Sequence, residues 1–116
     1  MTEQKFFAKI AFGDDFMGEI EIGKYFIEWD DNKEEANYKK HGIRFRVAAR
    51  IFLDENKIED YDELHSEYED RWKVVGKVRD ILVVIYTERG EKYRLISARF
   101  ANKREEDEYY GQYPNL

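Results

Sequence analysis

Residues 71–104 read RWKVVGKVRDILVVIYTERGEKYRLISARFANKR and carry the clearest fold signal in the chain. The unbroken apolar run ILVVI at residues 81–85 is typical of a β-strand that is covered on both faces. A strand is expected before this run over residues 71–78. Another is expected after it over residues 93–98, beyond a hairpin loop that contains Gly90. The stretch therefore predicts three consecutive antiparallel strands.

Positive charge is concentrated in the same stretch. It holds ten lysines and arginines against three acids, a local charge of +7, although the whole chain of 116 residues has a formal net charge of −6. A local excess of this size predicts an anion-binding surface on the sheet.

The composition limits the possible classes of protein. A length of 116 residues with 42% hydrophobic residues suits one core, so residues 1–116 are expected to form a single domain. Cysteine is absent, which excludes disulfides and thiol catalysis, and His41 and His65 are the only histidines, so no metal and no cofactor are expected. No apolar run has the length of a membrane span and the N-terminus lacks the pattern of a signal peptide. A cytoplasmic location without membrane contact is therefore expected.

Two helices are predicted before the three strands and one after them. Asp31 and Glu34 have the spacing of a capping box at the start of the first helix, and Gly42 is placed to end it. Asn102 and Glu105 have the same spacing at the start of the last helix. The second helix has one apolar stripe, which consists of Phe45, Ala48, Ala49 and Phe52.

The N-terminal part is expected to add a hairpin at the edge of the main sheet. Residues 5–12 are mostly apolar, residues 13–15 give a turn signal, and residues 19–29 are expected as strand that continues past Gly23. The order of elements therefore predicts an α+β fold, in which helices pack on a twisted antiparallel sheet.

An acidic segment precedes the basic stretch. Residues 54–70 hold nine acids against Lys57 alone. A short strand is expected at residues 57–61 and a solvated loop at residues 64–69. Catalysis by a carboxylate pair is the alternative, but such a pair needs a fixed separation and a dry pocket, which a long polar loop does not provide.

Several short motifs follow one another from Ile27 onward. They are Glu28-Trp29-Asp30, Asn32-Lys33, Asn37, Lys40-His41-Gly42-Ile43, Phe45, Asp62-Glu63, His65-Ser66, Arg71-Trp72, Gly76, Leu82-Val83-Val84, Tyr86-Thr87 and Arg89. The most specific piece is Arg94-Leu95-Ile96-Ser97-Ala98-Arg99, with Ala101, Arg104, Glu105 and Tyr109 after it. In this order and spacing, the chain resembles the BrnT family of type II toxins, which are relatives of the RelE-like ribonucleases.

The resemblance implies a RelE-like fold and a toxin that cleaves RNA without a metal and inhibits translation. It also implies a BrnA-like ribbon-helix-helix antitoxin, through which the complex binds DNA. Residues 27–116 correspond to the toxin core, whereas residues 1–26 lie outside the family pattern as an N-terminal extension. Glu106 and Asp107 also depart from the pattern, since the family tends to be basic there.

The resemblance and the basic surface together suggest a set of site residues. Metal-free RNA cleavage needs a base for the 2′-hydroxyl, cations for the phosphate and an acid for the leaving oxygen. Arg94 and Arg99 are the candidates for a phosphate clamp and Arg71 is next. On ideal pleating Arg94 and Ser97 point to opposite faces, and Arg99 points away from Arg94, unless the strand ends or bulges near Ser97. Lys33 and His41 are expected to approach from the first helix, where His41 could act as base or acid.

Apart from Arg94, which lies in the most specific motif, the candidates also have structural alternatives. Lys33 in the first turn of its helix could simply be solvated. Arg99 could pair with Glu105, Arg71 could pair with the acidic run before it, and His41 could interact with the dipole at a helix end. His65 is expected to hydrogen-bond within its loop. A second hypothesis follows for the whole chain: a binding module that docks an antitoxin-like partner on its basic face and has little or no RNase activity.

Overall fold

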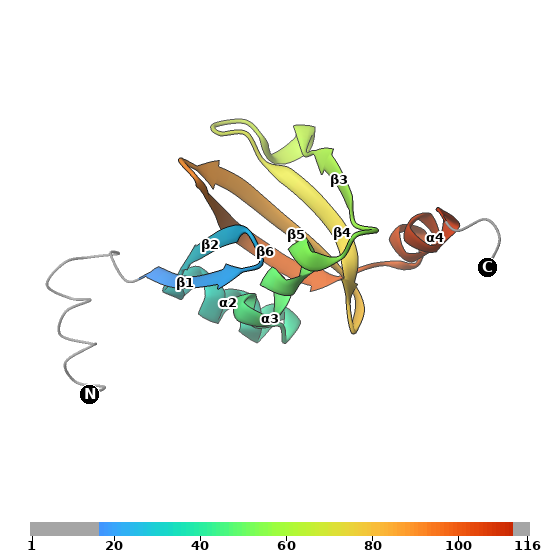
Figure 1. Ribbon diagram of the computed structural model, residues 1–116, viewed down its shortest axis with the longest axis horizontal. Helices are drawn as coiled ribbons and strands as arrows, with labels where there is room; N and C mark the ends of the chain where they lie inside the picture. Colours follow the sequence, from blue (N-terminus) through green and yellow to red (C-terminus); the bar gives the residue numbers. More distant parts are fainter. Residues whose placement is uncertain (1–16, 113–116) are drawn as a thin grey trace, which may run out of the picture.

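The computed structural model describes residues 17–112. Within this range, six strands form one sheet in the order β1-β2-β6-β5-β4-β3, which is antiparallel except where β2 runs parallel to β6 (Figure 1). The strands are β1 (Met17–Ile22), β2 (Tyr25–Asp30), β3 (Ile58–Tyr61), β4 (Trp72–Val78), β5 (Asp80–Arg89) and β6 (Lys92–Phe100). The helices are α2 (Asp31–His41), α3 (Phe45–Ala48) and α4 (Lys103–Gly111), with 3₁₀ segments η1 (Ala49–Leu53) and η2 (Glu63–His65). This arrangement confirms the expected α+β fold.

The main core lies between the sheet and the segment formed by α2, α3 and η1, which lies on one side of the sheet (Figure 1). α3 and η1 together occupy the place of the predicted second helix. Arg46 and Arg50, which lie away from the apolar stripe, are exposed. The predicted apolar stripe is buried and consists of Phe45, Ala48, Ala49 and Phe52, each at most 2% exposed.

β5 is covered on both faces over its first half, as its unbroken apolar run predicts. Leu82 and Val84 face the main core, whereas Ile81 and Val83 belong to a second, smaller cluster on the opposite face with Tyr109 of α4. α4 covers only one end of that opposite face (Figure 1). The remainder of the face is therefore available for a site.

The N-terminal hairpin differs in position from the expected one. The chain reverses at Gly23 and Lys24, so residues 19–29 belong to two strands and not to one continuing strand. The reason is the turn itself, in which Gly23 adopts a φ of +57° that residues with a side chain rarely adopt. The strand expected at residues 5–12 lies outside the described residues. β1 still extends the sheet beside β2, as expected for a hairpin at the edge.

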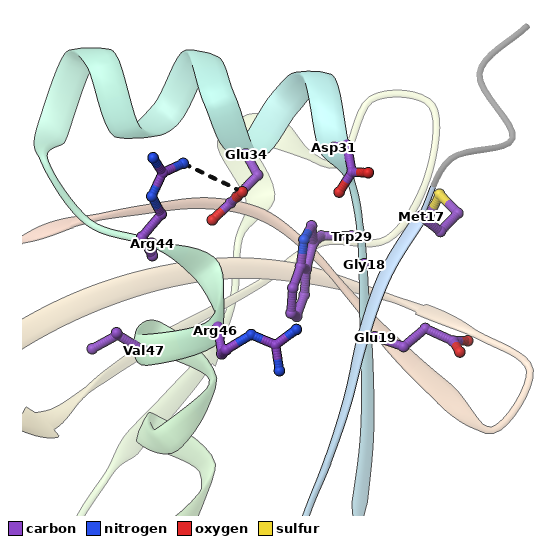
Figure 2. Close-up of a pocket in the computed structure, with 9 residues that line it drawn as sticks. All are labelled: Met17, Gly18, Glu19, Trp29, Asp31, Glu34, Arg44, Arg46 and Val47. Atoms are coloured by element: carbon purple, nitrogen blue, oxygen red, sulfur yellow. Dashed lines mark ion pairs between the residues drawn. The ribbon is translucent and has the colours of Figure 1, made fainter. Parts of the chain in front are cut away.

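Gly18 joins this hairpin to the core, because the indole of Trp29 lies against it (Figure 2). A Cβ atom at position 18 would lie 2.0 Å from Nε1 of Trp29, whose side chain is 3% exposed. Gly18→Ala is therefore expected to lower the free energy of unfolding by about 1–3 kcal/mol, through overpacking. Urea unfolding followed by tryptophan fluorescence measures this change. Gly111→Ala is the control, since a Cβ there meets no atom within 4 Å; equal stability of both variants would contradict the prediction.

The ends of α2 agree only in part with the sequence prediction. Gly42 ends the helix with a φ of +73°, as predicted. The N-cap, however, is Asp30 and not Asp31, because the Asp30 carboxylate accepts hydrogen bonds from the backbone N–H groups of residues 32 and 33. Glu34 has a different role from the one expected: it accepts the backbone N–H of Phe45 and so connects α2 to α3.

Asn37 of α2 completes the edge of β6 beyond the point where β2 stops pairing with it. Its side-chain amide accepts the N–H of Ala98 at 3.0 Å and donates to the carbonyl of the same residue at 2.9 Å. It also donates to the carbonyl of Ile43. Asn37 is 7% exposed, so these bonds satisfy backbone groups that water does not reach. The contact fixes the C-terminal end of β6, where the candidate site begins.

Candidate functional site

A β-bulge in β6 determines which arginines share a face of the sheet. Ile85 pairs with Ser97 and Tyr86 pairs with Leu95, so Ile96 is the extra residue between them. Without the bulge, Arg99 would point away from Arg94. With it, both arginines and Ser97 point to the face opposite the main core. Ser97 is therefore on the other face from the one that ideal pleating predicts.

An open groove lies on this face. It has a volume of about 360 Å³ and contains cations from three parts of the chain: Arg71 before β4, Lys73 on β4 and Arg99 on β6. His65 of η2 lies at its border. The other lining residues are Asp62, Leu64, Ile85, Ile96 and Ser97.

The loop of residues 62–71 forms one wall of the groove and is held by hydrogen bonds. The N–H of Asp62 donates to the carbonyl of Arg71 at 2.8 Å, and the N–H of Arg71 donates to Oγ of Ser66 at 2.9 Å. Thr87 on β5 donates its hydroxyl to the carbonyl of Asp70. Nδ1 of His65 lies 2.8 Å from Oδ2 of Asp62, which orients the imidazole ring. The acidic segment is thus a loop of fixed shape that positions His65 and Arg71.

Glu105 of α4 lies at one end of the groove between two of its cations. Nη1 and Nη2 of Arg99 donate to its two carboxylate oxygens at 2.8 and 2.9 Å, and Nζ of Lys73 lies 2.8 Å from Oε2. Glu105 also forms the predicted capping box with Asn102. The hydrogen bonds from Arg99 lower the pKa of Glu105 most, whereas burial raises it. The hydrogen bonds from Lys73 and from the N–H of Asn102 lower it further, and the resulting pKa is about 2. Arg99 and Lys73 therefore already bind a carboxylate.

Arg71 has a guanidinium that is only partly satisfied. One terminal nitrogen lies 3.5 Å from a carboxylate oxygen of Glu69, as the acidic run before it suggested. Its Nε is buried and has no hydrogen-bond partner among the described residues. Arg71 is thus bound less tightly by carboxylates than Arg99, both of whose terminal nitrogens donate to Glu105.

Arg94 and Lys33 lie outside the groove. Arg94 donates from Nε and Nη2 to Oε2 of Glu28, at 2.7 and 2.6 Å, and this pair connects β6 to β2. Along β6 it is four ladder positions from Arg99, about 13 Å at the usual rise of a strand. Lys33 is exposed in the first turn of α2, which packs on the other face of the sheet.

His41 ends α2 near Arg99 but does not line the groove. Its pKa lies below the ordinary value because of burial and because of repulsion by Lys40 and Arg99. The neutral imidazole is therefore favoured at pH 7. The structure thus brings Arg71 and Arg99 together in the groove, places His41 near Arg99 but outside the groove, and places Arg94 and Lys33 outside the groove as well.

Lys73 and His65 are site residues that sequence reasoning did not select. Lys73 shares a strand face with Arg71, so strand periodicity alone could have added it to the set. No sequence signal could place His65, because its position depends on the folded path of residues 62–71.

The family comparison covers this region. Residues 29–105 match the family model described as "Ribonuclease toxin, BrnT, of type II toxin-antitoxin system". The chain belongs to the BrnT family. Every residue that lines the groove lies inside the matched segment, whereas β1 lies before it. BrnT proteins are ribonuclease toxins of type II toxin–antitoxin systems, and such a toxin has an antitoxin as its partner.

A solved BrnT structure has the same fold. The crystal structure of the Brucella abortus ribonuclease toxin BrnT is 25% identical and superposes with a TM-score of 0.50. The match covers 65% of this chain and 94% of the Brucella chain. No curated protein matches the chain. Among the described residues of this BrnT-family chain, no helix is long and apolar enough to cross a membrane.

A larger hollow lies under the N-terminal hairpin, outside the groove. It has a volume of about 580 Å³ between β1, α2 and α3 (Figure 2). Its cations are already engaged: Arg44 pairs with Glu34 at 3.6 Å and stacks on Tyr38 at 3.7 Å, and Arg46 lies 5.7 Å from the centre of the Trp29 ring. In this BrnT-family chain the groove is therefore the better candidate for RNA chemistry.

Proposed function

We propose that this chain is a toxin that cleaves RNA in the groove without a metal ion and thereby inhibits translation. The observation that carries the proposal is the convergence of Arg71, Lys73 and Arg99 on one open groove within the segment that matches the BrnT family. Phosphodiester cleavage gathers negative charge on the phosphate, and fixed cations stabilise that charge.

The groove suggests a role for each side chain. Arg99 and Lys73 bind the phosphate oxygens, and Arg71 supplies a second guanidinium. His65, oriented by Asp62, transfers a proton, because it lines the groove whereas His41 does not. His41 lies near Arg99 at the end of α2 but outside the groove, so the proton transfer is not assigned to it. Arg94 is assigned to the connection between β2 and β6 through Glu28, and Lys33 to the solvated surface.

Glu105 favours a second candidate function. Its carboxylate satisfies Arg99 and Lys73, so an RNA phosphate has to compete with it for the same donors. A chain in which this pairing persists would bind a partner on the basic face without turning RNA over. Asp107, in contrast, is paired with Lys103 at 2.6 Å on the exposed side of α4 and is not in the groove.

The proposed partner is a BrnA-like ribbon-helix-helix antitoxin that covers the groove. DNA would be bound only through that antitoxin, and the pair would act in the cytoplasm. A short reading frame with a ribbon-helix-helix pattern next to the gene would support this partner.

The test is RNA cleavage by the purified chain in the presence of EDTA. Wild-type protein is expected to cut a single-stranded RNA, and Lys73→Ala is expected to reduce the rate at least tenfold because it removes one phosphate cation. Lys39→Ala is the control, since Lys39 is exposed on α2 and outside the groove. Intact RNA with folded wild-type protein that still binds its antitoxin would favour the binding module instead.

A further inference from the structure

A second basic hollow lies beyond the end of the groove, on the far side of Glu105. It has a volume of about 630 Å³ and lies between η1, the turn from β4 to β5, and α4. The residues that line it are Arg50, Leu53, Asp54, Asn56, Lys77, Val78, Arg79, Tyr109 and Tyr110.

The cations of this hollow are not neutralised. Arg50, Lys77 and Arg79 are all exposed, and none forms an ion pair with an acid within residues 17–112. In the groove, by contrast, Glu105 already occupies two cations. The hollow therefore holds three cations that remain available to an added anion.

The one acid that lines the hollow, Asp54, is occupied by other groups. Its Oδ2 accepts the N–H of Lys77 at 2.7 Å and the hydroxyl of Tyr109 at 2.6 Å, and its Oδ1 accepts the N–H of Asn56 at 2.9 Å. These bonds complete the edge of β4 beyond the end of β3, as Asn37 does for β6. Asp54 is thus turned toward the backbone and does not serve the arginines.

Arg79 adopts a backbone conformation that its residue type does not favour. It has a φ of +70° in the turn between β4 and β5, and it is the one residue other than glycine with a positive φ among the described residues. Glycine or asparagine is the usual residue in such a turn. An exposed arginine held in this conformation at the border of the hollow points to a role for its charge.

Aromatic surface lies beside these cations. Tyr110 is 48% exposed, and its ring is held edge-on by Tyr109 at 5.3 Å between ring centres. Exposed rings next to arginines and lysines are the elements by which proteins bind single-stranded nucleic acid, since bases stack on the rings and phosphates meet the cations. An acidic peptide would use the cations but has no need of the ring.

The hollow follows the groove along β4, beyond Val75, which is buried in one cluster with Tyr109 of α4. Lys73 in the groove and Lys77 in the hollow are on the same face of the strand, four residues apart, which is about 13 Å. We infer that the hollow binds the backbone of a single-stranded RNA next to the segment in the groove, with a base stacked on Tyr110. This inference rests on the proposed function and extends its substrate site.

Binding of an uncleavable RNA tests the inference separately from catalysis. The probe is a labelled single-stranded 2′-O-methyl oligoribonucleotide, and its affinity for the full chain is measured by fluorescence anisotropy over a range of salt concentrations. The triple variant Arg50→Gln, Lys77→Gln, Arg79→Gly is expected to bind at least tenfold more weakly. The slope of the logarithm of its affinity against the logarithm of the salt concentration should become shallower by about 2, as three lost phosphate contacts predict.

Four further variants sharpen the test. The control triple variant removes three exposed cations outside the hollow and should leave the affinity unchanged; its substitutions are Lys24→Gln, Lys39→Gln and Lys40→Gln. Tyr110→Ala should weaken binding several-fold while Tyr110→Phe retains it, because the ring and not the hydroxyl stacks. Arg79→Gly alone should weaken binding while the midpoint of thermal unfolding rises or stays the same, since glycine relieves the strained turn.

Each result decides between the alternatives. The inference would be overturned if the triple variant in the hollow and the control triple variant lost the same amount of affinity for the oligonucleotide. A wild-type chain that binds a poly-glutamate peptide in the hollow but not the oligonucleotide would also overturn it. Hollow-dependent binding by a chain that does not cleave RNA would leave the inference standing and contradict the proposed function. Cleavage that depends on Lys73, together with RNA binding that does not depend on the hollow, would overturn the inference and leave the proposed function standing.

Discussion

Arg99→Ala is expected to lower the rate of RNA cleavage by about 10²–10³-fold, because its guanidinium can hold two phosphate oxygens at once beside Lys73, which contacts the same carboxylate. The measurement is the initial rate of cleavage of a short RNA by purified protein, together with growth of a bacterial host in which the chain is induced. Host growth should recover with this variant if the wild type is toxic.

Two further variants separate the role of Arg99 from its contribution to folding. Arg99→Lys keeps a cation beside Glu105 and should fold like the wild type, yet it loses the paired geometry and should remain at least tenfold slower. Arg94→Ala removes the contact with Glu28, which costs stability, but should leave the cleavage rate of the folded protein within about threefold. A folded Arg99→Lys or Arg99→Ala protein with wild-type rate, or an Arg94→Ala protein as slow as Arg99→Ala, would refute this assignment.

Glu105→Gln is expected to lower the free energy of unfolding at pH 7 by about 3 kcal/mol, the energy that corresponds to a pKa of about 2 against an ordinary value of 4.5. The carboxylate is 7% exposed and bound by Arg99 and Lys73, so solvent screens the pairing only weakly. Urea unfolding at pH 7 measures the loss. Glu106→Gln, one position along α4, is the control and should change stability by less than about 0.5 kcal/mol.

The pH dependence of stability gives an independent check on Glu105. Because folding lowers its pKa, its contribution is complete above the unfolded value near 4.5 and is lost as the pH falls through about 2. Wild-type stability should therefore fall over this range more steeply than that of Glu105→Gln. Parallel curves for the two proteins would mean that Glu105 is not bound in solution as the structure has it.

The local features of the fold could be predicted from sequence because each depends on neighbouring residues. The apolar run at residues 81–85 predicted a strand with two covered faces, and Gly42 predicted the end of α2. The apolar stripe from Phe45 to Phe52 predicted the face of the second helical segment. The pairing of Arg99 with Glu105 was also expected, since a residue at the end of a strand and one in the first turn of the next helix lie close together.

Features that depend on distant contacts could not be predicted in the same way. The bulge at Ile96 has no glycine or proline to mark it, yet it decides that Arg99 faces the groove. Asp30 and not Asp31 caps α2 because the antiparallel pairing of β2 with β1 extends the strand to that residue, where Asp30 pairs with Met17. The position of His65 depends on the folded loop of residues 62–71. The sequence therefore predicted Arg71 and Arg99 of the candidate site but not Lys73 and His65.

The parallel contact of β2 with β6 has a consequence for how the chain folds. Glu28 and Arg94 are 66 residues apart in sequence, so during synthesis β2 emerges long before the strand that it joins. Contacts of such separation form slowly, and an unpaired strand edge invites association with other chains. The β1–β2 hairpin is local and can form in about 1–10 μs. It gives β2 a partner on one side while the rest of the sheet is still being made, and the groove, which needs Arg99, is completed only after β6 has been made.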